Sequence, residues 1–215
     1  MKTLKTAIVA ATLMTSASAM AVEVSGNVAI GSDYFFRGFD QSMGAAISGG
    51  FDLDLGGGLY AGTWGSSVDD YTSAGGLELD HYFGYGGSFS DAVSYDIGYI
   101  LYTYPNDTQY NFEEVYGSVS FSDVTLGFAT SDDWYGGSGS YDYLYAGYSM
   151  AISEAFSLGF HYGTHSGAGD YDDYSISLST EAAGLGFDLS WISTSEAGEE
   201  AYADNEFVLT ISKSM

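Results

Sequence analysis

Polar and apolar residues alternate along most of this chain with a period of two. Phe51, Leu53 and Leu55, for example, are separated by Asp52 and Asp54. The same alternation returns at 77–85, 185–191 and 206–212. Because successive side chains of a β-strand point to opposite faces, each segment has one apolar face and one face of carboxylates, hydroxyls and glycine.

The spacing of these segments predicts an all-β fold, a closed antiparallel transmembrane β-barrel. Outer-membrane barrels combine an even number of strands with short periplasmic turns and longer extracellular loops. Here short connections such as 56–57 and 88–91 alternate with long polar ones at 33–43, 67–75, 105–111, 132–140, 165–172 and 195–203. We predict about twelve strands, with about ten as the alternative. The predicted strands are 22–32, 44–55, 58–66, 76–86, 93–104, 112–121, 124–131, 141–152, 156–164, 173–180, 185–194 and 204–214.

A soluble β-sandwich is the rival fold, because it also contains many short alternating strands. A sandwich, however, gives no reason for long and short connections to alternate. The predicted apolar faces are nearly free of charge, as a lipid-facing band requires, with His81 and Lys213 as exceptions. A closed barrel also satisfies every backbone polar group in lipid without a helix.

The N-terminus predicts export. Lys2 and Lys5 precede an apolar run at 7–14, which is too short to span a bilayer as a helix. Small residues then offer cleavage after Ala21, with Ala19 as the alternative. We therefore expect a signal peptide at 1–21, rather than a membrane anchor, and one barrel domain at 22–215 in the outer membrane of a Gram-negative bacterium.

The net charge of the chain limits the classes of molecule that it can bind. Without the signal peptide, Arg37 and Lys213 are the basic residues against 29 acidic ones, and the chain has no cysteine. Such a surface repels nucleic acid. The carboxylates must sit in water or meet cations. The expected partners are outer-membrane lipid, small solutes and the outer-membrane assembly machinery.

The densest motif follows the first predicted strand, at 32–42. If Val28 and Ile30 face lipid, the opposite parity turns Asp33 and Arg37 inward. Arg37 could brace the barrel wall or form part of a constriction that orients an anionic group of a solute. Both interpretations predict bidentate pairing with an Asp or Glu carboxylate.

Further carboxylates are predicted on the inner face. They are Asp52, Asp54, Glu78, Asp80, Asp96, Glu114, Asp188 and Glu206. A lumen lined by acids attracts cations and excludes anions. Alternatively, the acids hydrate a plugged interior, because many inward positions carry tyrosine: Tyr82, Tyr102, Tyr104, Tyr116, Tyr143 and Tyr145. Twelve strands leave a narrow space around such rings.

Metal binding and catalysis have weaker support. Two acidic loop clusters could bind a hard divalent cation through oxygen; they are Asp132 with Asp133, and Asp170 with Asp172 and Asp173. Neither has the spacing of a calcium loop, and no cofactor is expected. Serines are so abundant that a pairing with His81, His161 or His165 carries little information, and no Gly-x-Ser-x-Gly elbow precedes a helix, so we predict that the protein is not an enzyme. Trp64, Trp134 and Trp191 are expected in the interfacial girdles of the barrel.

The motif Ser32-Asp33-Tyr34-Phe35-Phe36-Arg37-Gly38, after an alanine-rich leader, resembles the TorF family of porins, also described as the Gcw_chp family of unknown function. Further segments at 78–80, 102–105, 113–116, 172–175 and 209–214 resemble that family in the same order. The resemblance covers nearly the whole chain after the leader and implies an outer-membrane barrel.

Together these patterns predict a porin that passes small, preferentially cationic solutes through a narrow acidic lumen. The alternative is a non-conducting barrel whose acidic extracellular loops bind a ligand or partner.

Overall fold

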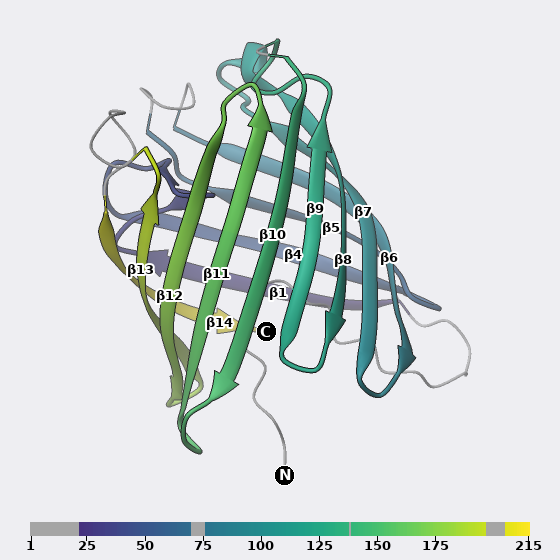
Figure 1. Ribbon diagram of the computed structural model, residues 1–215, viewed down its shortest axis with the longest axis vertical. Coiled ribbons are helices and arrows are strands. Elements are labelled where there is room, and N and C mark those ends of the chain that lie inside the picture. The colour runs from purple at the N-terminus through teal and green to yellow at the C-terminus, as the bar shows by residue number, and fades with distance from the viewer. Residues whose placement is uncertain (1–21, 70–75, 138, 197–204) are drawn as a thin grey trace.

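Twelve long antiparallel strands close into one barrel in the computed structural model, which describes residues 22–69, 76–137, 139–196 and 205–215 (Figure 1). The predicted fold and strand number are confirmed, and the alternative of ten strands is wrong. The strands are β1 (Glu23–Gly31), β4 (Ala46–Gly56), β5 (Leu59–Ser66), β6 (Glu78–Ser90), β7 (Val93–Thr103), β8 (Phe112–Phe121), β9 (Val124–Ser131), β10 (Tyr141–Ala151), β11 (Phe156–Gly167), β12 (Tyr171–Ala182), β13 (Leu185–Thr194) and β14 (Glu206–Ser214). The expected signal peptide, 1–21, lies outside the described residues.

The first and last strands form the seam that closes the barrel. β1 pairs with β14 in a register that joins Asn27 to Ser214 and Gly31 to Thr210. The last residue extends this ladder, because Met215 N donates to Gly26 O at 2.9 Å and Gly26 N donates to Met215 O at 3.1 Å. The barrel therefore has no free sheet edge, as a wall in lipid requires.

The two ends of the barrel differ in their connections. The short turns 57–58, 91–92, 122–123, 152–155 and 183–184 define the turn end, where β1 also begins and β14 stops. The longer connections define the opposite loop end (Figure 1). One predicted loop is much shorter than expected: β11 and β12 extend until only 168–170 separates them, instead of 165–172.

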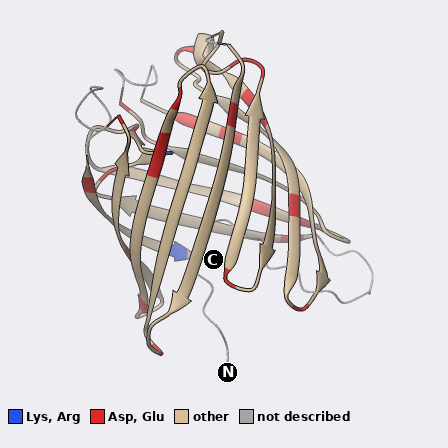
Figure 2. Ribbon diagram, in the orientation of Figure 1, with Lys and Arg blue, Asp and Glu red and all other residues tan. Residues whose placement is uncertain are grey.

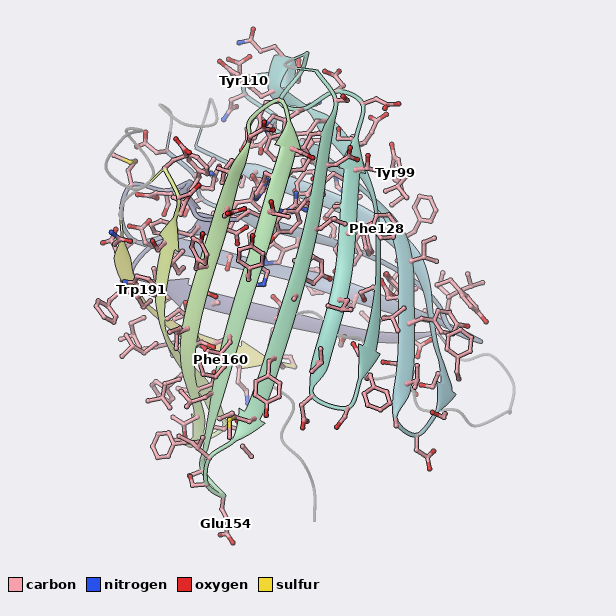
Figure 3. All side chains as sticks on the ribbon, in the orientation of Figure 1. Tyr99, Tyr110, Phe128, Glu154, Phe160 and Trp191 are labelled. Atoms are coloured by element: carbon pink, nitrogen blue, oxygen red, sulfur yellow. The ribbon has the colours of Figure 1, made fainter. Side chains whose placement is uncertain are left out.

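Apolar side chains cover the outside of the wall. Phe51 and Phe83 are each 61% exposed, and Figure 3 shows Phe160 and Trp191 projecting outward from the strands. Such a band suits the hydrocarbon core of a bilayer. Within the described residues, no helix is long and apolar enough to cross a membrane.

The long connection between β1 and β4 contains a small hairpin that the sequence did not predict. β2 (Phe35–Phe36) and β3 (Phe39–Asp40) pair through a two-residue turn. The φ angles of that turn are 50° at Arg37 and 87° at Gly38. Positive φ at both central residues is the type I′ geometry that matches the twist of paired strands, and glycine adopts it without steric cost. A short 3₁₀ helix, η1 (Thr108–Tyr110), lies in the β7–β8 connection.

The packed interior lies at the loop end. Two buried clusters form there, one of Tyr102, Tyr104 and Phe112 and one of Ala129, Tyr141 and Tyr143. Phe36 of the hairpin packs against the first cluster, and Trp134 packs against both. The barrel is thus filled near its loops, and its inner face is less buried toward the turn end.

Two of the three tryptophans are not in a membrane girdle, contrary to the prediction. Trp64 meets the Tyr34 ring at 5.4 Å, and Trp134 stacks on Tyr141 at 3.9 Å, both inside the loop end. Trp191 lies on the outside of the wall (Figure 3). Trp64 and Trp134 lie in the interior because residues 32–45 pack there and supply aromatic rings for them to contact.

Tyrosine rings inside the barrel lie over glycines of the neighbouring strand. A Cβ atom added to Gly62 would stand 2.4 Å from the Tyr82 ring, and one added to Gly127 would stand 2.3 Å from the Tyr145 ring. The same relation joins Gly84 to Tyr60, Gly98 to Tyr116 and Gly163 to Tyr143. This packing accounts for five of the glycines and five of the tyrosines in a chain rich in both.

We predict that Gly127→Ala destabilises the barrel by about 1–3 kcal/mol, because the Tyr145 ring must move from its packed position. The measurement is the urea midpoint of unfolding, followed by the gel-mobility shift between folded and heat-unfolded protein. Gly147→Ala is the matched control on β10, because the nearest heavy atom to its added Cβ is 3.9 Å away. Equal midpoints for the two variants would contradict this role for the glycines.

Candidate functional site

The hairpin carries its tip across the lumen. It leaves the wall between β1 and β4, yet Arg37 contacts Glu114 on β8 and Tyr141 on β10. In the strand order of the closed barrel, β9 lies opposite β1, with β8 and β10 on either side of it. The chain between β1 and β4 therefore reaches the far wall. We call residues 32–45 the crossing loop.

A bidentate ion pair fixes the tip of the crossing loop. Arg37 Nη1 donates to Glu114 Oε1 at 2.8 Å, and Nη2 donates to Oε2 at 2.9 Å. Tyr102 Oη also donates to Glu114 Oε2 at 3.1 Å, and Nη1 of Arg37 donates to Tyr141 Oη. The Glu114 side chain is 1% exposed and that of Arg37 is 13% exposed. This is the bidentate pairing that the sequence predicted for Arg37.

Aromatic rings enclose the same guanidinium. Its Cζ lies 4.3 Å from the centroid of the Tyr143 ring, 4.6 Å from that of Phe36 and 5.4 Å from that of Tyr141. A cation over a ring face is attracted by the ring quadrupole, most strongly where water is excluded. We call Glu114, Tyr102, Tyr141 and Tyr143, all on the barrel wall, the guanidinium cage.

Two more predicted carboxylates are buried on β6. Glu78 accepts from Tyr34 Oη at 2.8 Å and from Tyr104 Oη at 2.7 Å, which satisfies both of its oxygens. Asp80 is 5% exposed, and its Oδ1 has no hydrogen-bond partner within the described residues. An unpaired buried oxygen is costly, and this oxygen and Nδ1 of His165 are the two buried side-chain atoms without a partner among the described residues.

A second cluster, which the sequence did not predict, joins two histidines to one aspartate. Asp173 Oδ1 lies 2.9 Å from His161 Nε2, and its Oδ2 lies 3.2 Å from His165 Nε2. Tyr143 Oη is 2.7 Å from His161 Nε2, so this cluster adjoins the guanidinium cage. Among the described residues, the side-chain partners of the two histidine Nε2 atoms are Tyr143 and Asp173.

Toward the turn end, carboxylates and tyrosines share the less buried inner face. Tyr60 Oη donates to Asp96 at 2.9 Å and lies 2.8 Å from Tyr116 Oη. Tyr60 is on β5 and Tyr116 on β8, so their side chains can meet only inside the closed wall. Asp52 accepts from Tyr82, and Asp188 accepts from Ser179 and Ser190. Figure 2 shows acidic residues along the wall and few basic ones.

The remaining predicted residues lie at the two rims. Asp54 Oδ1 accepts from Gly56 N at 2.8 Å, beside the β4–β5 turn. At the loop end, carboxylate oxygens of Asp33, Asp40 and Glu206 lie within 4.8 Å of one another. Burial, together with a hydrogen bond shared with Asp33, raises the pKa of Asp40 from 3.8 to about 6.

The two predicted loop clusters lie in different kinds of segment. Asp172 and Asp173 are in β12 rather than in a loop, and as neighbours in a strand they face opposite sides of the wall. Asp173 reaches the two histidines, whereas Asp172 accepts from Tyr174 at 3.4 Å and Asp170 accepts from Gly167 N at 3.1 Å. The physical reason is the extension of β12 into the predicted loop. Asp132 and Asp133 begin the β9–β10 connection, where both are exposed.

Solved structures with the same fold are porins. The structure titled "KdgM porin" has a TM-score of 0.62 at 10% identity, covering 89% of this chain and 99% of that chain. A second KdgM structure, described as a complex with disordered oligogalacturonate, has a TM-score of 0.60 at 8% identity over 91% and 99% of the two chains. The NanC porin has a TM-score of 0.56 at 11% identity over 87% and 97%. At these identities the likeness is one of fold.

Sequence comparison gives the family. No curated protein matches the chain in sequence. The Gcw_chp family, described as a bacterial protein of unknown function, matches residues 15–215, which include every strand of the barrel and the crossing loop. The chain therefore belongs to the Gcw_chp family, as its motif at 32–38 led us to expect.

Proposed function

We propose that this protein is an outer-membrane channel of the porin type that passes small solutes and prefers cations. The apolar outer face and the fold shared with porins support a channel in a bilayer. The observation that carries the preference is the charge of the inner face. Its guanidinium is neutralised by Glu114, whereas Asp52, Asp96 and Asp188 remain as carboxylates nearer the turn end.

The proposed solutes differ from the ligand named for KdgM. Oligogalacturonate is an anionic saccharide, and an anion is drawn to basic groups. This chain has Arg37 and Lys213 as its basic residues after the expected signal peptide. Lys213 is near the turn end, where Nζ donates to Gly184 O at 2.8 Å and the side chain is exposed. We therefore propose cationic solutes rather than acidic sugars.

The crossing loop limits passage in this proposal. It spans the lumen and packs with the buried rings of the loop end, so its position sets how wide the channel is. The same observation favours a second candidate, a non-conducting barrel whose loops bind a ligand. Single-channel recording of the folded protein in planar bilayers separates the two functions. Discrete steps support the channel, and silence from protein with the folded gel mobility overturns it.

Neutralising a lumen carboxylate is expected to weaken cation preference. A unit charge about 4 Å away attracts a cation by about 1 kcal/mol in aqueous surroundings, so Asp96→Asn should lower the cation-to-anion permeability ratio by up to about fivefold. The reversal potential under a salt gradient measures this ratio. Glu113→Gln is the control, because Glu113 is exposed and neighbours the inward Glu114 on the same strand. An equal shift in both variants would contradict an acidic lumen.

Fixing the crossing loop to the wall is expected to stop conduction. A Cβ atom on Gly38 would lie 3.2 Å from Cβ of Thr194, near the roughly 3.5–4.5 Å span of a disulfide. Since the chain has no cysteine, the pair Gly38→Cys and Thr194→Cys can form one disulfide only, although a side chain at residue 38 is strained at its φ of 87°. We expect the oxidised protein to conduct far less than the reduced one, with each single variant insensitive to reductant. Unchanged conductance of the bonded form shows that the loop does not gate the channel.

Acidification is expected to close the channel further. Asp33 of the crossing loop and Glu206 of β14 face Asp40, and the docked loop raises the pKa of Asp40 to about 6. A carboxyl whose pKa is raised while the crossing loop lies across the lumen stabilises that position of the loop at low pH. This contribution is lost as pH rises through about 6. Open probability should therefore fall between pH 7 and 5. Asp40→Asn should remove that part of the dependence, and its full persistence in the variant would exclude Asp40 as the cause.

A further inference from the structure

The guanidinium cage and the group that fills it belong to separate parts of the molecule. Glu114, Tyr141 and Tyr143 project from β8 and β10, which are held by the barrel ladders on both sides. Arg37 comes from the turn of a two-stranded hairpin, where its φ of 50° is unusual for a residue with a side chain. Withdrawal of the hairpin would leave the cage intact on the wall.

The cage has the chemistry of a binding site for an organic cation. The carboxylate of Glu114 matches the two-pronged donor face of a guanidinium, and both of its oxygens are used by Arg37. The centroids of the Tyr143 and Tyr141 rings lie 4.3 and 5.4 Å from the guanidinium carbon. Rings in these positions favour the binding of a flat, weakly hydrated cation. An ammonium group shares the charge but lacks the planar fork.

Two further acidic side chains, Glu78 and Asp80, are buried close to the cage. Glu78, Asp80 and Glu114 are 2%, 5% and 1% exposed, and the one guanidinium among them pairs with Glu114. Oδ1 of Asp80 has no hydrogen-bond partner in the part of the chain that the structure describes, although it is buried. A buried acidic oxygen without a partner favours the entry of a cation that can donate a hydrogen bond to it.

We propose that the cage is a solute subsite for compounds that carry a guanidinium group, and that Arg37 occupies it when no solute is present. A guanidinium solute competes with Arg37 for Glu114 and the tyrosine rings. Displacement of Arg37 removes the contact that holds the tip of the crossing loop on the far wall, so binding opens the loop end. This inference rests on the proposed channel function for its second step, but the binding step can be measured without conduction.

Trp134 provides the binding signal, because it stacks on Tyr141 of the cage at 3.9 Å. The variant with Trp64→Phe and Trp191→Phe keeps Trp134 as its tryptophan. Detergent-folded protein is titrated with methylguanidinium, with methylammonium as the charge control and methylurea as the neutral control of similar shape. We expect a saturable fluorescence change with methylguanidinium at a half-saturating concentration about tenfold below that for methylammonium, and no saturable change with methylurea.

Two substitutions in this background test the competition. Arg37→Ala removes the internal competitor, so half-saturation by methylguanidinium should fall by about tenfold. Glu114→Gln should abolish the saturable response, whereas Glu113→Gln, on the opposite face of β8, should leave it unchanged. Gel mobility checks that each variant is folded. If Glu114→Gln does not fold, Arg37→Ala alone decides, because competition requires tighter binding in that variant.

Three outcomes overturn the inference: equal responses to the three probes, no tightening in Arg37→Ala, or saturation that survives Glu114→Gln. The channel proposal fails separately. Conduction without a methylguanidinium response leaves the channel and removes the subsite. Saturable binding without conduction supports the subsite and removes the channel. In bilayers, methylguanidinium should raise the open probability of the parent protein and have little effect on Arg37→Ala.

Discussion

The ion pair between Arg37 and Glu114 joins two parts of the protein that the barrel ladders do not connect. One partner is on a loop between β1 and β4, and the other is on the opposite wall. Removing either residue leaves the other charge buried, which typically costs about 3–5 kcal/mol. The position of the tip of the crossing loop therefore depends on this contact, whereas the bonds of Tyr34 to Glu78 and of Tyr135 to Gln41 hold other parts of the loop.

The wall that supports this contact is built from a simple pairing of residue sizes. Tyrosine rings on one strand cover glycines on the next, as Tyr145 covers Gly127 and Tyr143 covers Gly163. Each ring fills space that the missing side chain leaves, and its hydroxyl reaches a polar partner further along the inner face. Tyr143 shows both effects, because its ring covers Gly163, lies beside Arg37 and places its hydroxyl near His161. The same packing that narrows the lumen thus also positions the polar groups of the candidate site.

The strands could be predicted from sequence because the wall imposes its own period. Lipid on one side and a polar interior on the other select for alternation, and the ranges predicted for β8, β9 and β13 agree with the structure at both ends. The bidentate partner of Arg37 could be predicted only as a class, because parity gives the face of Glu114 but not its distance from a loop.

The unpredicted parts depend on contacts between distant segments. No local sequence pattern predicts that residues 35–40 form a hairpin inside the barrel, because polar and apolar residues do not alternate regularly in loops. Register was also needed to see that Asp173 lies opposite Gly163, between His161 and His165. Trp64 shared the parity of the inward Tyr60, and that relation offered a signal for its interior position. Asp172 was assigned to the loop 165–172 because strand ends are set by pairing, here between β12 and β11, rather than by the alternation alone.

The seam between β1 and β14 has a consequence for how the barrel forms. Its paired residues run from Asn27 to Gly31, a shorter ladder than the one between β10 and β11, which runs from Tyr141 to Ala151. The seam also joins residues nearly the full chain length apart. Every other ladder of the barrel joins wall strands that follow each other along the chain, with β4 following β1 after the hairpin of β2 and β3. Long-range pairing bears the largest loss of chain entropy, so this ladder closes last, after the final strand has been made and delivered. A barrel that opens sideways in the bilayer would separate first at the same line.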